Sequence, residues 1–249
     1  MNARLETTAP AINPEQAIGQ IAVALPGATA VFRRMKLDFC CGGQVSLRQS
    51  VAEKGLDLAA VVDELAGLRY GDAPVGLTEP VALIDHILAR YHDVHRQQLP
   101  ELIRMARRVE SVHRENPHVP TGLADALETM EQELLGHMQK EEQILFPMLK
   151  SGGNPFVAQP IGMMRHEHVD HGDALAKVMA LTHDATPPQG ACNTWRALYA
   201  GLAQFSDDLV NHIHLENNVL FPQFEPQLEA AAAPAPEAGG CGTGGCGCS

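Results

Sequence analysis

One stretch of the chain occurs twice, 75 residues apart and without a gap. Residues 137–147 read HMQKEEQILFP, and residues 212–222 read HIHLENNVLFP. Both copies share His-x-x-x-Glu, followed by two aliphatic residues and Phe-Pro. In a helix, residues four apart lie one above the other on the same face. Each copy therefore directs an imidazole and a carboxylate toward whatever that face packs against.

The duplication extends upstream of these two stretches. His92 and His95 are three residues apart, and so are His168 and His171, 76 residues later. Each half is thus a helix with a His, a loop, and a helix with His-x-x-x-Glu. Two helices cannot bury their apolar faces alone, so the two halves should pack together. The pattern predicts an all-α fold, an up-down four-helix bundle with four His and two Glu pointing inward.

Composition and charge exclude several classes of partner. A formal net charge of −12 argues against nucleic acid, because phosphate contacts need a basic surface. No window reaches the roughly 18 uninterrupted apolar residues of a membrane span. The first residues form no apolar signal region, so we expect a cytoplasmic protein. The six cysteines form no spaced framework and should be thiols or metal ligands.

The sequence divides into four predicted parts. Residues 1–13 are expected to be a disordered leader, and residues 14–71 a small helical domain with a Cys-Cys turn. Residues 78–229 hold the four bundle helices, in which each presumed ligand interrupts an apolar stripe. Residues 230–249 are rich in Ala, Pro and Gly, include three cysteines, and are expected to be disordered.

Several residues mark where helices should begin or bend. Ser46 and Asp57 are predicted to cap helices of the small domain. Glu79-Pro80 is a helix start with proline in the first turn. Pro100 lies inside the first bundle helix and is expected to kink it, because it removes one backbone hydrogen bond.

The inward-facing side chains predict a metal centre. A buried, charged Glu costs several kcal/mol unless something compensates it. Imidazole with carboxylate suits iron, manganese or zinc rather than calcium or magnesium. Six ligands are too many for one zinc with its usual four, but they suit two metals that share both carboxylates. Isolated core histidines would not recur at matched intervals. The predicted ligands are His92, His137, Glu141, His168, His212 and Glu216.

Other residues are candidates for supporting roles. Glu133 and Asp208 each lie one turn before a ligand His, and we predict that they are hydrogen-bond partners or proton relays. His95 and His171 are expected near the site without binding metal. The vicinal pair Cys40-Cys41 cannot close a useful disulfide loop, so it is interpreted either as functional thiols or as small core residues.

Long motifs connect the chain with a known family. They are Asp38-Phe-Cys-Cys-Gly-Gly43, Arg90-Tyr-His-Asp93, residues 137–147, Glu167-His168 and residues 212–222. On these motifs the chain from about 14 to 225 resembles the iron–sulfur cluster repair di-iron proteins, which have a hemerythrin-like domain. The resemblance implies two iron ions, held by the same six ligands and bridged by an oxo group, Glu141 and Glu216. Oxygen-carrying hemerythrins differ, since Gly172 and Asn217 stand here where those have His and Asp.

Three functions follow as hypotheses. The resemblance favours repair of iron–sulfur clusters damaged by nitric oxide or oxidative stress, in which the chain supplies iron. The alternative is a scavenger that binds or reduces nitric oxide. A third is a sensor whose state is transmitted through the N-terminal domain. The implied partners are damaged iron–sulfur proteins and nitric oxide, and a homodimer stays open. Whether the chain is an enzyme is left open, because iron delivery and catalysis need the same ligands.

Overall fold

The computed structural model describes residues 12–25, 27–68 and 79–225. Most of the predicted leader and all of the predicted tail at 230–249 lie outside these residues. Within the described ranges every regular element is helical and no strand is present, which confirms the all-α prediction. None of these helices is both long enough and apolar enough to cross a membrane.

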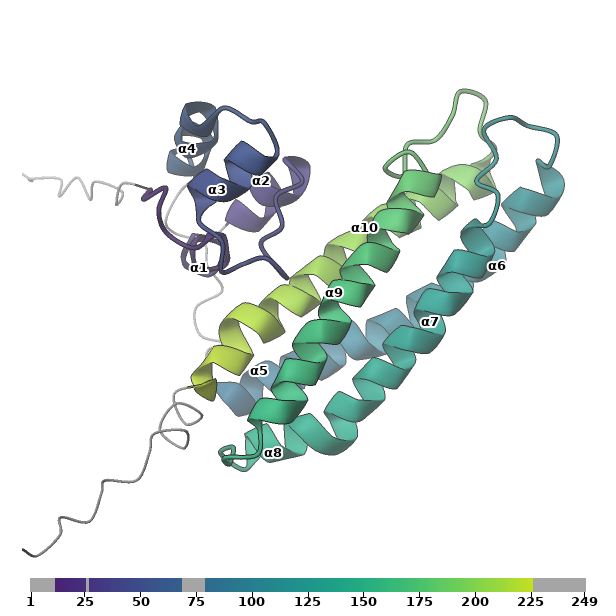
Figure 1. Cartoon of the computed structure of the whole chain (residues 1–249). Coiled ribbons are helices and arrows are strands. Elements are labelled where there is room, and N and C mark those ends of the chain that lie inside the picture. The colour runs from purple at the N-terminus through teal and green to yellow at the C-terminus, as the bar shows by residue number, and fades with distance from the viewer. Residues whose placement is uncertain (1–11, 26, 69–78, 226–249) are drawn as a thin grey trace, which may run out of the picture.

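The N-terminal domain consists of four short helices around its own small core (Figure 1). They are α1 (Ile18–Ala24), α2 (Ala28–Arg34), α3 (Leu47–Glu53) and α4 (Leu58–Ala66). The two predicted caps are confirmed, since Ser46 accepts a hydrogen bond from the backbone of Gln49 and Asp57 from that of Ala59. Phe32 and Phe39 pack together in this core.

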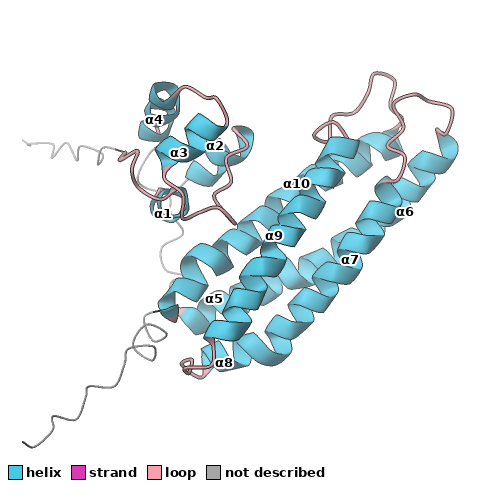
Figure 2. Ribbon diagram, in the orientation of Figure 1, coloured by secondary structure: helices cyan, strands magenta, loops and turns pink. Residues whose placement is uncertain are grey.

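The second domain is an antiparallel bundle of long helical rods (Figures 1 and 2), and the element order gives four of them. Three of the four rods consist of more than one segment, because a π-helical turn interrupts them. The first rod consists of α5 (Pro80–Ile87), the π turn η1 (Leu88–His92) and α6 (Asp93–Val112), and the second of α7 (Leu123–Lys140), the π turn η2 (Glu141–Leu145) and α8 (Phe146–Lys150). The third rod is α9 (Ala158–Leu181). The fourth consists of α10 (Asn193–Leu215), the π turn η3 (Glu216–Leu220) and the 3₁₀ turn η4 (Phe221–Gln223).

Two of the π turns occupy matched positions in the two halves of the bundle. Glu141 opens η2 and Glu216 opens η3, 75 residues later. π turns inside helices are rare and concentrate at functional sites. The first rod departs from α geometry at η1, whereas α6 continues through Pro100 to Val112. Glu79 caps α5 with Pro80 at its first position, as predicted.

Two apolar clusters fill the bundle on either side of a polar layer. One surrounds Trp195 and Phe205 and extends toward the loops that follow α6 and α9. The other surrounds Phe146 and Phe221 at the α5 and α8 end (Figure 1). The predicted ligands lie between the two clusters, where the side chains exclude water from the site.

Candidate metal centre

The fold brings all six predicted ligands together in the layer between the apolar clusters. His137, His168 and His212 come from α7, α9 and α10, while His92, Glu141 and Glu216 lie on the π turns. All six are at most 1% exposed. They form two groups that share both carboxylates. The groups are His92, His212, Glu141 and Glu216, and His137, His168, Glu141 and Glu216.

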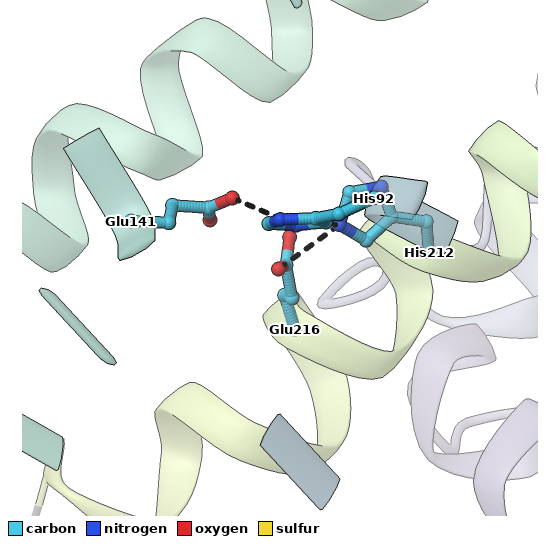
Figure 3. Close-up of side chains that lie close together, drawn as sticks. All are labelled: His92, Glu141, His212 and Glu216. Atoms are coloured by element: carbon cyan, nitrogen blue, oxygen red, sulfur yellow. Dashed lines mark hydrogen bonds and ion pairs between the residues drawn. The ribbon is translucent and has the colours of Figure 1, made fainter. Parts of the chain in front are cut away.

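The first group is compact (Figure 3). Nε2 of His92 lies 3.1 Å from Nε2 of His212. Nε2 of His212 lies 3.1 Å from Oε1 of Glu216, and Nε2 of His92 lies 3.4 Å from Oε2 of Glu141. Two carboxylates thus approach the same pair of imidazoles from different helices.

The second group repeats this arrangement with the other two imidazoles. Nε2 of His137 and Nε2 of His168 are 3.1 Å apart. Oε2 of Glu216 lies 3.1 Å from Nε2 of His168, and Oε2 of Glu141 lies 3.5 Å from Nε2 of His137. Each carboxylate therefore contacts one imidazole of each group, which is the placement that a bridging ligand needs.

Three of the imidazoles are oriented by partners on their outer nitrogen. Nδ1 of His92 is 2.7 Å from Oε1 of Glu142, and Nδ1 of His137 is 2.9 Å from Oε2 of Glu167. Nδ1 of His168 is 2.9 Å from the side-chain oxygen of Asn217. These oxygens only accept, so each Nδ1 carries the hydrogen and donates it. In a neutral imidazole the other nitrogen, Nε2, then keeps a lone pair.

These tautomers fit a cation between the ligands. The lone pairs of His137 and His168 face each other at 3.1 Å with no hydrogen to share. Both oxygens of Glu141 are buried without a hydrogen-bond partner. Burial and the charge of Glu216 hold the pKa of Glu141 well above its usual value. Burial also lowers the pKa of His92 to about 4. Nitrogen and carboxylate donors of this kind fit first-row transition metals.

Two basic side chains hold the carboxylates of Glu142 and Glu167 in place. Arg96 donates to Oε1 of Glu142 at 2.6 Å, the same oxygen that contacts His92. Lys140 forms an ion pair with Glu167. A carboxylate that accepts from a ligand imidazole raises the basicity of that ligand and fixes its orientation.

The two supporting residues predicted from the sequence do not contact the ligands in this way. Glu133 is exposed on α7, which does not support its predicted role. Asp208 is buried, but it accepts from Arg90 at 2.6 Å, Gln204 at 3.0 Å and Gln98 at 3.1 Å rather than from a ligand. Burial raises the pKa of Asp208, and the hydrogen bonds from Arg90, Gln204 and Gln98 outweigh that effect and hold it below its usual value.

The residues that do contact the imidazoles lie next to the predicted ligands in the sequence, so the repeat also marks them. Glu142 and Asn217 each follow a ligand Glu, and they correspond in the repeat. Glu167 directly precedes His168, and its counterpart in the first half is Tyr91, whose ring stacks on His212 at 5.4 Å. A comparison of the positions that flank the ligands would have selected all of these residues.

The Cys-Cys turn of the N-terminal domain lies against the centre. Sγ of Cys41 is 3.4 Å from the carbonyl oxygen of His168. Asn217, which accepts from His168, also donates through Nδ2 to the carbonyl oxygen of Cys40 at 3.1 Å. The two sulfur atoms are 3.6 Å apart, and Sγ of Cys40 is 3.4 Å from Oδ1 of Asp38. Hydrogen bonding with Cys41 and burial raise the pKa of Cys40.

Comparisons with known proteins agree with this architecture. A family model described as "Hemerythrin HHE cation binding domain" matches residues 83–224. A second, "ScdA_N: Domain of Unknown function", matches residues 14–69. The "Iron-sulfur cluster repair protein YtfE" of Dickeya chrysanthemi is 48% identical over 212 residues, which cover 84% of this chain and 96% of that protein. The protein of the same name from Escherichia coli O139:H28 is 46% identical over 213 residues, with the same coverage.

These matches extend over both domains and include the whole region that holds the six converging side chains. They agree with the resemblance drawn from the motifs. The chain belongs to the hemerythrin family and, within it, to the YtfE family of iron–sulfur cluster repair proteins.

Proposed function

We propose that the chain holds two iron ions and supports the repair of iron–sulfur clusters damaged by nitric oxide or oxidative stress. In this proposal the protein acts in the cytoplasm and supplies iron to the damaged protein. The observation that carries it is the convergence of four imidazoles and two shared carboxylates in a water-excluding layer. The names of the two relatives, iron–sulfur cluster repair proteins, support the repair role.

The residues divide into two metal positions. His92 and His212 would hold one iron, and His137 and His168 the other, with Glu141 and Glu216 shared between them. An oxo bridge is the further link that the family resemblance implies. When bound, the iron pair supplies metal ions for transfer. The protein contributes the lone pairs, the orientation of each ring and the exclusion of water.

Each metal position has one imidazole without a carboxylate partner on its outer nitrogen, and we expect this to favour release of iron. In the His92/His212 position, Nδ1 of His212 is buried without a hydrogen-bond partner among the described residues. In the His137/His168 position, His168 is supported by the neutral amide of Asn217 rather than by a carboxylate. An amide oxygen increases the basicity of an imidazole less than a carboxylate does. We therefore expect His168 to be the weaker donor of its pair. It is also the ligand that the N-terminal domain contacts.

The Cys-Cys turn is the proposed route between the centre and a client. Asp38, Cys40 and Cys41 bring three donor atoms within 4.8 Å of one another. Thiolate and carboxylate donors suit a ferrous ion. Cys41 is half-buried and contacts the backbone of His168. A thiol pair in this place is suited to accept iron that leaves the centre or to exchange it with a damaged protein.

An isotope experiment tests the proposal. The full chain is loaded with ⁵⁷Fe and mixed anaerobically with an iron–sulfur enzyme that nitric oxide has inactivated. We expect the enzyme to regain activity and to contain ⁵⁷Fe, while the Glu141→Leu variant transfers none. Catalytic loss of nitric oxide, with no label in the recovered enzyme, would contradict iron supply and favour the scavenger.

A further inference from the structure

Two buried imidazoles next to the centre have no assigned role. His95 is 0% exposed and His171 is 3% exposed. Neither ring nitrogen of His95 makes a well-formed hydrogen bond with a described residue, although the side chain of Gln98 lies close to the ring, and Nδ1 of His171 is likewise unpaired. An unsatisfied buried polar group costs about 1–3 kcal/mol. A leucine would fill either space without this cost, so packing alone does not account for the pair.

The two rings lie symmetrically beside the two groups of ligands. The ring centroid of His95 is 5.4 Å from that of His212, in the first group. The centroid of His171 is 4.8 Å from that of His137, in the second. Each residue stands three positions after a ligand His, on the first and third rods of the bundle. A buried imidazole with at least one unpaired nitrogen thus occurs at the matched position in both halves of the repeat.

The direction of the helices places this pair opposite the shared carboxylates. α6 and α9 run toward the loops at one end of the bundle, and α7 and α10 run away from them (Figure 1). His95 and His171 are therefore displaced from the ligand histidines toward the loops. Glu141 and Glu216, four residues after their histidines on the opposite rods, are displaced toward α5 and α8. The carboxylates cover one face of the layer, and His95 and His171 cover the other.

His95 and His171 lie next to the two groups of ligands but belong to neither group. The two groups whose donors gather within 4.8 Å do not include His95 or His171. The unpaired nitrogens of the two rings therefore lie beside the ligand groups without being part of them. The missing partner must be small, because apolar side chains such as Phe205, whose ring centroid is 5.4 Å from that of His95, fill the surrounding space.

We propose that His95 and His171 form a distal pair that donates hydrogen bonds to a small anionic or diatomic ligand held on the centre's open face. This inference rests on the di-iron centre of the proposed function and adds the two side chains that would orient a ligand there. The acceptor atoms of such a ligand supply the partners that both rings lack. One imidazole on each side also favours a ligand that spans the two metal positions.

Azide is a suitable probe, because it is small, anionic and visible by infrared spectroscopy. The iron content of the oxidised full chain is measured first, and azide is then titrated into the wild type, His95→Leu and His171→Leu. We expect both variants to retain two irons and to bind azide about tenfold more weakly, which corresponds to the loss of about 1.4 kcal/mol. The azide stretch should shift in D₂O for the wild type and lose that shift when both residues are replaced.

Matched variants separate hydrogen bonding from packing. His95→Gln and His171→Gln keep an N–H donor, so they should restore azide affinity and the D₂O shift. If the leucine variants fail to fold, His95→Met and His171→Met, which also lack a donor, take their place. His166→Leu, an exposed change on α9, should behave like the wild type.

The possible outcomes distinguish failure of the distal pair from failure of the proposed di-iron centre. Wild-type affinity and an unchanged D₂O shift in the iron-loaded leucine variants would overturn the distal pair. Iron loss as complete as in Glu141→Leu would do so too, because the residues would then be ligands. A wild type that binds no iron pair would refute the proposed centre, and with it the inference, before any azide is added.

Discussion

Asn217 accepts a hydrogen bond from Nδ1 of His168 at 2.9 Å and donates one to the carbonyl oxygen of Cys40 at 3.1 Å. One side chain thus joins a predicted metal ligand of the bundle to the thiol turn of the N-terminal domain. The orientation of the ligand and the position of the turn therefore depend on the same amide.

Replacement of Asn217 by Ala should weaken iron binding without emptying the site. The loss of a partner that orients a ligand imidazole typically costs 10–100-fold in metal affinity. The rate at which a ferrous chelator removes iron from the reduced protein measures the effect. Gln139→Ala, an exposed change on α7, is the control. Equal release rates for the two variants would show that Asn217 does not orient His168.

Replacement of Glu141 by Leu should abolish the iron pair. Glu141 contacts an imidazole of each group, so its loss removes one shared donor from both positions. Metal analysis should give about two irons per wild-type chain and few or none in the variant. One tightly bound zinc in the wild type would contradict the assignment of the centre.

Asp208→Asn should destabilise the fold at neutral pH and have less effect in acid. The pKa of Asp208 in the fold lies below its usual value, so the folded chain binds this proton more weakly than the unfolded chain. The charged form therefore stabilises the fold above the unfolded value of about 3.9, and this contribution is lost as pH falls through the lower, folded pKa. Hydrogen bonds to a charged group contribute about 1.5–3 kcal/mol each.

Denaturant unfolding of the wild type and of Asp208→Asn at several pH values tests this expectation. The difference in the free energy of unfolding should be largest near pH 7 and shrink below about pH 4. Glu133→Gln, an exposed change at the corresponding position of the repeat, should match the wild type at every pH. A pH-independent difference would assign the effect to packing instead.

The double change Cys40→Ala, Cys41→Ala should separate iron binding from iron transfer. The bundle keeps all six predicted ligands, so we expect iron content and thermal stability close to the wild type. Reactivation of a nitric-oxide-damaged enzyme should fall toward the level of Glu141→Leu. Cys192→Ala removes an exposed thiol elsewhere and serves as the control. Unchanged repair would exclude the thiols, and a large loss of stability would favour a packing role for Cys40.

Gly43→Ala should detach the thiol turn from the bundle. A Cβ atom at Gly43 would lie 2.5 Å from the side-chain oxygen of Asn218 and 2.7 Å from the carbonyl oxygen of Phe39. Asn218 donates to that same carbonyl at 3.1 Å, so the turn must move. Alkylation of Cys41 should accelerate in the variant. Gly162→Ala meets open space on α9 and should leave the rate unchanged.

The sequence predicted the helical fold and the six converging side chains because both depend on periodicity. A helix fixes which residues share a face, and the duplication selected the ligands from twelve histidines. The partners of the ligands were harder to predict. Glu142 reaches His92 on another rod, and Glu167 reaches His137. Such contacts depend on how two helices are rotated about their axes, which spacing along one chain does not determine.

Two further features needed three-dimensional information. Glu133 and Asp208 correspond in the repeat, yet Glu133 is exposed and Asp208 is buried under Arg90. Equivalent positions can thus acquire different surroundings when their neighbours diverge. The contact between Cys41 of the Cys-Cys turn and His168 of α9 joins two domains. The sequence pattern of each domain is independent of the other, so neither pattern predicts how the two domains pack together.

The matched π turns at Glu141 and Glu216 carry the sequence repeat into the geometry of the backbone. A π turn contains one residue more than an α turn, so it rotates the residues that follow by about 100° relative to an uninterrupted α-helix. The ligand histidines His137 and His212 precede these turns, and the buried Phe146 and Phe221 follow them. The same rotation in both rods thus lets the ligands and the apolar residues after them face the inside of one bundle.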